Sequence, residues 1–531
     1  MDALRQAMRD AALRLPKPAG VPLSYGTAGF RHDAALLDST AVEAIVQEEG
    51  VPVGDATRGR VVLARDTRES GPRLLDAALQ GVALVPGVTP ASCALLTTPQ
   101  LHWLVWAANR QPPASPLLPS EDLYFSTLAS AFKALLPASS PSPSAAPFPC
   151  PPLLVDAANG VGAPKLQRLV EEVRGRAGVA LAVAVRNTGG EGEGELNEGV
   201  GADFVQKEQR APRGFGGDAD MAHRCVSLDG DADRLVYFFH SPPSPSATAA
   251  ATASQPASTP DSAAPAFHLL DGDKIAALFT SFLVQTLRAI SPSSPTPPAS
   301  ASALPPCAWF ALPSFRPISL GVVQTAYANG ASTAYLASQL GCAPAVARTG
   351  VKHVHAVAER WDVGVYFEAN GHGTVLFGEE LLGWLQAQTE KGLPEGSALQ
   401  RLAALSMLCN QAVGDALANV LAVEAVLRCH GWSHHEWSRM YHDLPSRQIK
   451  VRVAERSMFL PCDDDTRLLE PTALQATIDA AVAGVAGGRA FVRASGTEDV
   501  VRVYAEATRQ EQADGLARTV AAAVERHSPV P

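Results

Sequence analysis

The segment Ser227-Leu228-Asp229-Gly230-Asp231-Ala232-Asp233-Arg234-Leu235 is the most informative part of the chain. Small residues separate its carboxylates, so a tight loop can direct Asp229, Asp231 and Asp233 towards one point. A ligand set made only of oxygen favours Mg²⁺, which takes six oxygens at about 2.0 to 2.1 Å. A solvated acidic turn and an EF-hand calcium loop are the alternatives, but an EF-hand loop needs a Glu at its twelfth position, where Phe239 or His240 stands. The segment predicts a magnesium site.

Repeated strand, turn and helix signals surround this loop. The apolar run at 236–239 follows it directly, and further buried strands are predicted at 61–64, 152–156, 320–325 and 363–367. Several of these runs end in polar residues and lead into a helical pattern, which is typical of an α/β architecture with parallel strands. Such folds place their sites at the carboxyl ends of the strands. Strands from 448 and a helix from 510 form the last segment.

Length and composition limit the possible functions. The 531 residues allow roughly three or four domains. A net charge of −10, with no block rich in Lys and Arg, argues against a nucleic-acid or anionic-membrane surface. Eight scattered cysteines without a C-x-x-C pair fit reduced thiols. Residues 1–15 lack the apolar core of a secretory signal, and no run approaches about 18 apolar residues. We therefore expect a cytoplasmic protein that binds neither nucleic acid nor membrane. A monomer is expected as well.

Four stretches rich in Pro, Ser and Ala interrupt the pattern of strands and helices. They span 111–120, 137–152, 242–266 and 291–306. The first two read as linkers or loop insertions, and the last two are predicted to be disordered insertions because they cannot build a core.

Polar loops elsewhere carry further ligand groups. The loop at 24–31 combines glycines with Arg31, a fork of donors suited to phosphate. The loop at 368–373 offers a carboxylate, an amide and glycines, which suits sugar hydroxyls. Between Arg489 and Arg502, arginines flank a Ser-Gly-Thr turn and form a predicted phosphate nest.

Histidines are less informative than these loops. The spacing of His353, His355 and His372 resembles no zinc site. Ser433-His434-His435-Glu436 is a capping box that starts a helix, so the nearby histidines are expected on the surface.

Five motifs in this order resemble the α-D-phosphohexomutase superfamily, and in their detailed form its phosphoacetylglucosamine mutase branch. They begin at Tyr25 (Tyr-Gly-Thr-Ala-Gly-Phe-Arg), Asp229 (Asp-Gly-Asp-Ala-Asp-Arg), Thr349 (Thr-Gly-Val-Lys-His), Glu368 (Glu-Ala-Asn-Gly-His-Gly) and Arg493 (Arg-Ala-Ser-Gly-Thr-Glu-Asp). The resemblance covers nearly the whole chain outside the insertions. It implies three mixed α/β domains and a C-terminal α+β domain around one cleft, at 1–136, 152–290, 318–430 and 440–531. It also implies an isomerase, an intramolecular phosphotransferase that interconverts N-acetylglucosamine 6-phosphate and 1-phosphate with Mg²⁺, on the route to UDP-N-acetylglucosamine.

The resemblance also assigns roles to individual residues. The metal ligands would be Asp229, Asp231 and Asp233, and the catalytic residues would be Lys352 and His353. The substrate would be bound by Glu368, Ala369, Asn370, Arg493, Ala494, Ser495, Gly496, Thr497 and Arg502. Ala494 stands where the family has Pro.

One motif of the superfamily does not occur in this sequence. Relatives place a Thr-Ala-Ser-His-Asn-Pro loop, whose phosphoserine donates the phosphoryl group and binds the metal, before the Arg-Asp-Thr-Arg motif that starts at Arg65. Between Arg31 and Arg65 no such loop is found, so the first domain is expected to be truncated. Either an exon is missing through an error in the gene model, or the chain is a non-catalytic hexosamine-phosphate binder or regulatory subunit. Binding groups alone cannot replace the covalent step, because phosphate-monoester chemistry needs rate enhancements of up to ~10²¹.

Overall fold

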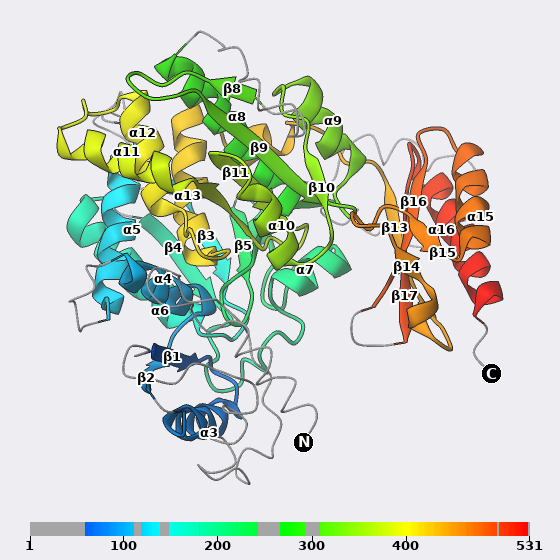
Figure 1. Cartoon of the computed structure of the whole chain (residues 1–531), viewed down its shortest axis with the longest axis horizontal. Coiled ribbons are helices and arrows are strands. Elements are labelled where there is room, and N and C mark those ends of the chain that lie inside the picture. Colours follow the sequence, from blue (N-terminus) through cyan, green and yellow to red (C-terminus); the bar gives the residue numbers. More distant parts are fainter. Residues whose placement is uncertain are drawn as a thin grey trace.

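The computed structural model describes residues 59–85, 87–110, 118–137, 148–179, 181–221, 223–242, 266–291, 308–495 and 499–528. The glycine loop at 24–31 lies outside these residues, as do almost all of the insertions at 242–266 and 291–306. The chain forms a large α/β body and a C-terminal unit that stands apart from it (Figure 1).

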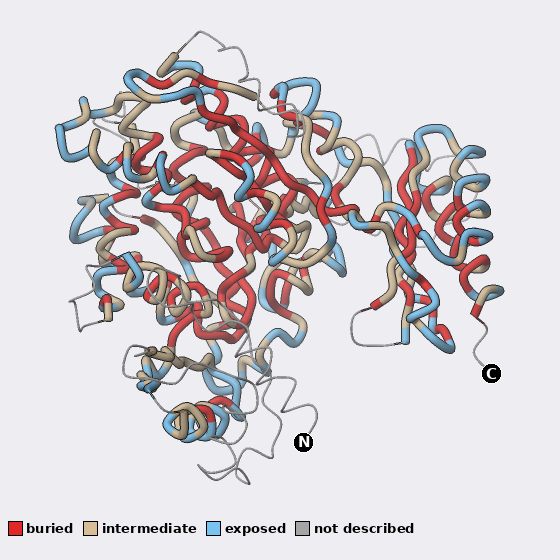
Figure 2. Tube along the Cα trace, in the orientation of Figure 1, coloured by how far each residue is buried: buried red, intermediate tan, exposed pale blue. Residues whose placement is uncertain are grey.

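The first described unit is small. Its two parallel strands, β1 (Gly59–Arg65) and β2 (Val88–Leu95), are joined by α3 (Gly71–Ala83) and followed by α4 (Thr98–Asn109). Within α3 only Gly71 and Ala78 are buried, and Figure 2 shows mostly partly exposed chain here. The described part of this unit therefore agrees with the expected truncation of the first domain.

Helix α5 (Glu121–Leu135) lies within the predicted first domain, which runs to residue 136, but it packs against the second and third units. It packs against α6 (Gly162–Glu172) and α12 (Ala398–Leu408), and its residues Tyr124, Phe125 and Phe132 are fully buried. The aromatic side chains of α5 thus join the core of the two central units.

The second unit contains a five-stranded sheet in the order β4-β3-β5-β6-β7. Its strands are β3 (Phe148–Asp156), β4 (Leu181–Arg186), β5 (Arg224–Leu228), β6 (Leu235–Ser241) and β7 (Ala266–Leu270). Strands β3, β4 and β5 are parallel, whereas β6 and β7 are antiparallel to their neighbours. The helical elements are η2 (Val173–Ala177), α7 (Ala202–Glu208), η3 (Asp218–Asp220) and α8 (Gly272–Ile290), besides α6. Residues 229–234, called the metal loop below after the predicted magnesium site, form the short turn between β5 and β6.

The third unit repeats this plan. Its sheet has the order β10-β9-β11-β12, with β8 also paired to β9. The strands are β8 (Ala308–Phe310), β9 (Ile318–Thr325), β10 (Ala345–Ala347), β11 (Val363–Phe367) and β12 (Gly373–Phe377). The helices are α9 (Gly330–Ser338), α10 (Val351–Ala358), α11 (Glu379–Glu390), α12, α13 (Ala416–His430) and α14 (His434–Ser438). One continuous core joins the second and third units and includes α5, α8 and α13.

The C-terminal unit has its own core. Its antiparallel sheet has the order β13-β17-β16, formed by β13 (Ser446–Arg452), β17 (Val500–Glu506) and β16 (Arg489–Ala494). A short hairpin of β14 (Leu460–Pro461) and β15 (Leu468–Glu470) lies beside it, with η6 (Arg456–Met458), α15 (Thr472–Ala483) and α16 (Gln510–His527). Apolar residues of β13, β16, β17, α15 and α16 form a separate cluster.

The two large sheets contain both parallel and antiparallel strands, in agreement with the mixed α/β domains expected above. Short connections join β5 to β6 and β11 to β12 and allow only antiparallel pairing there. One expectation from the sequence is wrong. The predicted capping box of Ser433 and Glu436 is present, but His434 is buried rather than on the surface because its ring packs edge-on against Phe239. His435 and His442 are exposed, as expected.

Candidate active site

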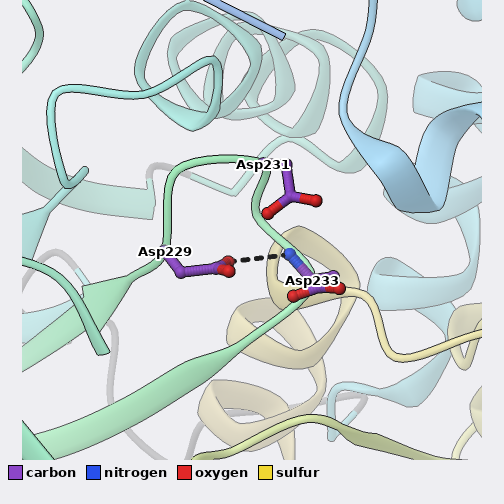
Figure 3. Close-up of side chains that lie close together, drawn as sticks. All are labelled: Asp229, Asp231 and Asp233. Carbon is purple, nitrogen blue, oxygen red and sulfur yellow. Dashed lines mark hydrogen bonds between the residues drawn. The ribbon is translucent and has the colours of Figure 1, made fainter. Parts of the chain in front are cut away.

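The three aspartates of the loop between β5 and β6 converge. Asp229, Asp231 and Asp233 each offer a carboxylate oxygen, and these oxygens all lie within 4.8 Å of one another (Figure 3). Asp229 Oδ1 accepts hydrogen bonds from the amides of Asp233 at 3.0 Å and Arg234 at 3.1 Å, which closes the turn. The predicted clustering of the three carboxylates is therefore confirmed.

The electrostatics of this loop favour a bound cation. Burial, together with the charges of Asp233 and Asp231, raises the pKa of Asp229 well above its ordinary value. Burial and the charge of Asp231 raise the pKa of Asp233 to about 6. Asp233 Oδ1 is buried and accepts no hydrogen bond from a residue that the structure describes. The Arg234 guanidinium balances part of this charge, since its Nε lies 3.4 Å from Asp233 Oδ1 and 3.8 Å from Asp229 Oδ2. Two buried carboxylates and a partly buried third, with oxygens within 4.8 Å of one another, fit a divalent metal with oxygen ligands.

Contacts from the second unit itself and from the first unit fix the shape of the metal loop. Gly160, in the turn after β3, lies so close that a Cβ there would meet the carbonyl oxygen of Gly230 at 2.3 Å. From the first unit, Thr98 at the start of α4 donates its hydroxyl to Asp231 Oδ2 at 2.7 Å and its amide to Asp231 O at 3.2 Å. Thr98 was not identified from the sequence, because its role depends on a contact across 133 residues.

The predicted sugar loop joins the metal loop directly. It connects β11 to β12, and His372 in it forms an isolated antiparallel bridge with Arg234. His372 Nδ1 lies 3.3 Å from Asp233 Oδ2, and burial lowers the pKa of His372 to about 4. A Cβ on Gly371 would meet the carbonyl oxygen of Leu235 at 1.7 Å. The two loops therefore form one packed surface.

Within the sugar loop, the residues proposed for binding are partly exposed. Glu368, Ala369 and Asn370 are all of intermediate burial. Asn370 Oδ1 accepts the amide of His372 at 3.1 Å, and Glu368 Oε1 accepts the amide of Gly350 at 2.9 Å. These contacts orient the two polar side chains while leaving part of each accessible to a ligand.

The predicted catalytic pair, Lys352 and His353, lies at the start of α10. Lys352 is exposed and His353 partly buried, and the helix begins after Gly350. Burial, followed by the neighbouring charges of Lys352 and Arg348, lowers the pKa of His353. A neutral imidazole at neutral pH can accept a proton. The amide contact from Gly350 to Glu368 places this pair next to the sugar loop.

The predicted phosphate residues lie on β16, on β17 and in the turn between them. Arg493 and Arg502 are cross-strand partners, and Ala494 pairs with Val501. The amide of Ser495 donates to Val500 O at 2.8 Å. Gly496 and Thr497 lie outside the described residues. Arg493 donates from Nε to Asp465 Oδ2 at 3.0 Å, a contact that the sequence did not reveal.

Mixed α/β units, a loop of three converging aspartates, a polar loop beside it and an arginine pair on a separate C-terminal unit are the plan expected of a phosphohexomutase, and matching family domains agree with that class. The family domains described as "Phosphoacetylglucosamine mutase AMG1, domain II" and "domain III" match residues 114–236 and 309–432. The domain described as "Phosphoglucomutase/phosphomannomutase, C-terminal domain" matches 449–523.

Similar proteins narrow this class. A phosphoacetylglucosamine mutase of Arabidopsis thaliana is 40% identical over 95% of this chain and 95% of its own length, and one of Oryza sativa subsp. japonica is 41% identical over 99% and 87%. The crystal structure of Aspergillus fumigatus N-acetylphosphoglucosamine mutase in complex with GlcNAc-6P and magnesium matches with a TM-score of 0.73 and 39% identity, over 92% of this chain and 80% of that one. The chain belongs to the phosphoacetylglucosamine mutase family. In the described part of the chain, no helix combines the length and the apolar character needed to cross a membrane.

Proposed function

We propose that this chain is an isomerase that interconverts N-acetylglucosamine 6-phosphate and N-acetylglucosamine 1-phosphate in the formation of UDP-N-acetylglucosamine. The observation that carries the proposal is the direct junction of the metal and sugar loops, at His372 and Asp233. Membership of the family supports the choice of substrate.

Each part of the site has a proposed task. Asp229, Asp231 and Asp233 would hold Mg²⁺, which when bound would neutralise charge on the phosphoryl group in transit. Glu368 and Asn370 would accept and donate hydrogen bonds to sugar hydroxyls, with Ala369 in van der Waals contact with the ring. A further set of residues would hold the phosphate that does not react, namely Arg493, Ala494, Ser495, Gly496, Thr497 and Arg502.

Lys352 and His353 are proposed to act at the reacting end of the sugar. The exposed Lys352 ammonium can balance phosphoryl charge. Burial and the neighbouring cations lower the pKa of His353, which favours its neutral form, so it can take a proton from a sugar hydroxyl that attacks a phosphorylated donor. The sequence between Arg31 and Arg65 holds no serine motif to act as that donor, so a separate phosphorylated compound would have to supply the phosphoryl group. The partial burial of His353 supports this role, because a buried imidazole resists protonation by solvent.

A phosphorus NMR assay tests the proposed reaction. The purified chain is incubated with N-acetylglucosamine 6-phosphate and Mg²⁺, and a 1-phosphate resonance is expected to appear. Asp229→Asn should abolish it because the metal loop loses a ligand, whereas Asp463→Asn, an exposed carboxylate in the C-terminal unit, should not. Failure of the native chain to form the 1-phosphate would contradict the isomerase proposal.

A non-catalytic hexosamine-phosphate binder is the second candidate. It is favoured by one observation, the lack of the Thr-Ala-Ser-His-Asn-Pro motif between Arg31 and Arg65. Calorimetry with N-acetylglucosamine 6-phosphate would then show saturable binding, weakened in Arg502→Ala, without turnover. If the native chain gave no heat of binding, the non-catalytic binder would be excluded too.

We further infer that the protein acts as a cytoplasmic monomer built from the four domains predicted above. The metal, sugar and phosphate groups all come from one chain, which supports a monomer. Six cysteines in the described residues are free thiols, which fits a reducing compartment. Size-exclusion chromatography with light scattering measures the oligomeric state directly.

A further inference from the structure

Two groups of polar contacts connect the C-terminal unit to the third unit. In the first, Arg489 donates to the carbonyl oxygens of Ala326 at 2.7 Å and Ala328 at 2.5 Å and pairs with Glu506 at 2.8 Å. Tyr327 packs against Phe491 at the same place, with a ring-centroid distance of 5.0 Å. These hydrogen bonds, ion pair and aromatic contact hold the two units together near the segment that connects them.

The second group centres on one carboxylate, that of Asp465. Asp465 lies in the turn between β14 and β15, and its side chain is fully buried. Its Oδ2 accepts hydrogen bonds from Arg493 Nε at 3.0 Å and from the amide of Thr349 at 2.9 Å. Its Oδ1 lies 3.8 Å from Arg348 Nε. One oxygen of the C-terminal unit therefore binds both a phosphate-site arginine of that unit and the backbone of the third unit.

The turn that carries Asp465 is shaped to present this carboxylate. Asp465 has a φ of +58°, a left-handed conformation that Asp and Asn adopt more readily than other non-glycine residues. Its amide donates to Cys462 O at 3.1 Å. Asp464 caps the turn by accepting the amide of Thr466 at 3.1 Å and its hydroxyl at 2.6 Å. Asp463, in contrast, is exposed to solvent.

The contact continues from Asp465 to the sugar loop. Thr349 and Gly350 are consecutive, and their amides donate to carboxylates on opposite sides, the first to Asp465 and the second to Glu368. Three hydrogen bonds and the 349–350 backbone thus link Arg493, through Asp465, to Glu368. Because hydrogen bonds to a charged group are short and directional, a displacement at one end is transmitted to the other.

We propose that Asp465 is a positioning residue that couples phosphate recognition by Arg493 to sugar recognition by Glu368. The inference rests on the proposed roles of these two residues. Asp465 itself need not contact the substrate. It orients the Arg493 guanidinium beside the like-charged Arg502 and ties the C-terminal unit to the loop that holds Glu368 in place.

The expected effect is a loss of selectivity rather than a general loss of phosphate affinity. Removing the carboxylate loosens Arg493 but also removes a negative charge next to the phosphate site, so the two effects oppose each other for inorganic phosphate. For a sugar phosphate, the weakened link to Glu368 adds a further loss. The preference for N-acetylglucosamine 6-phosphate over inorganic phosphate should fall about tenfold, the size expected when a hydrogen bond to a charged group is removed.

Calorimetry with both probes tests this expectation in the full chain. Asp465→Ala should lower the ratio of the Kd for inorganic phosphate to the Kd for N-acetylglucosamine 6-phosphate about tenfold. Asp465→Asn, which retains an oxygen and tolerates a positive φ, should lower it less. Asp463→Ala removes the same charge two residues away and should leave the ratio unchanged. Hydrogen exchange should show faster exchange at residues 349–353 in Asp465→Ala and near-native exchange in Asp465→Asn.

The possible outcomes separate this inference from the proposed function. If Asp465→Ala keeps the ratio within about twofold of the native value, or if Asp463→Ala lowers it equally, the coupling role is wrong even where the native chain turns over substrate. If Asp465→Ala does not fold, an unchanged ratio in Asp465→Asn leads to the same conclusion. A lowered ratio in a chain without turnover supports the coupling and refutes the isomerase. No binding of either probe by the native chain refutes both.

Discussion

Replacing Gly371 by alanine tests whether the junction of the metal and sugar loops sets the geometry of the site. Gly371 has a φ of +84°, and a Cβ there would lie 1.7 Å from the carbonyl oxygen of Leu235, the first residue of β6. Because β6 follows the metal loop directly, the strand or the sugar loop must move to relieve this overlap. The movement should separate His372 from Asp233.

The loss of stability expected from Gly371→Ala has two parts. A non-glycine residue in the left-handed region costs about 1–2 kcal/mol, and overpacking adds about 1–3 kcal/mol. Gly392, in the loop after α11, has a φ of +87°, but a Cβ there would have no neighbouring atom within 4 Å. Gly392→Ala therefore measures the backbone part alone. Gly371→Ala should destabilise the protein by about 2–5 kcal/mol in total.

Thermal unfolding with and without Mg²⁺ measures both parts. Gly371→Ala should unfold at a lower temperature than Gly392→Ala and should need more Mg²⁺ for half-maximal stabilisation, because the carboxylates no longer converge. Gly392→Ala should retain the native Mg²⁺ dependence. Equal unfolding temperatures and equal Mg²⁺ dependence for the two variants would refute the argument that contact between the loops sets the metal geometry.

Three further results are expected. The pKa of Asp233 is raised to about 6, so protonation of Asp233 stabilises the metal-free protein fully below the ordinary aspartate pKa, and this stabilisation is lost as the pH rises through 6. Mg²⁺ should therefore stabilise the protein more at pH 7.5 than at pH 5, and equal stabilisation at both would be contrary evidence. Arg224→Met leaves the buried carboxylate of Glu424 without its cation and should cost about 3–5 kcal/mol. Arg467→Ala breaks an exposed pair with Asp479 and should cost at most about 1 kcal/mol, as thermal unfolding would show. Hydrogen exchange should be fast in α3 and slow in α5, because few residues of α3 are buried; comparable protection would be evidence against a weakened first unit.

The sequence by itself determined the local features of the site. Alternate aspartates with small residues between them favour a tight loop, and the structure confirms that Asp229, Asp231 and Asp233 converge. The strands at 61–64, 152–156, 320–325 and 363–367 lie within β1, β3, β9 and β11, because short apolar runs bounded by turn residues give a strong signal.

Only the tertiary structure decided which distant residues support this site. Thr98 meets Asp231, and Asp465 meets Arg493 and Thr349, through contacts that span up to 133 residues and leave no periodic signal in the sequence. The burial of His434 has the same origin, because a capping box defines where a helix starts but not which face packs against Phe239. Local patterns record what a segment does with its own backbone, whereas burial and pairing depend on the surface that the rest of the chain presents to it.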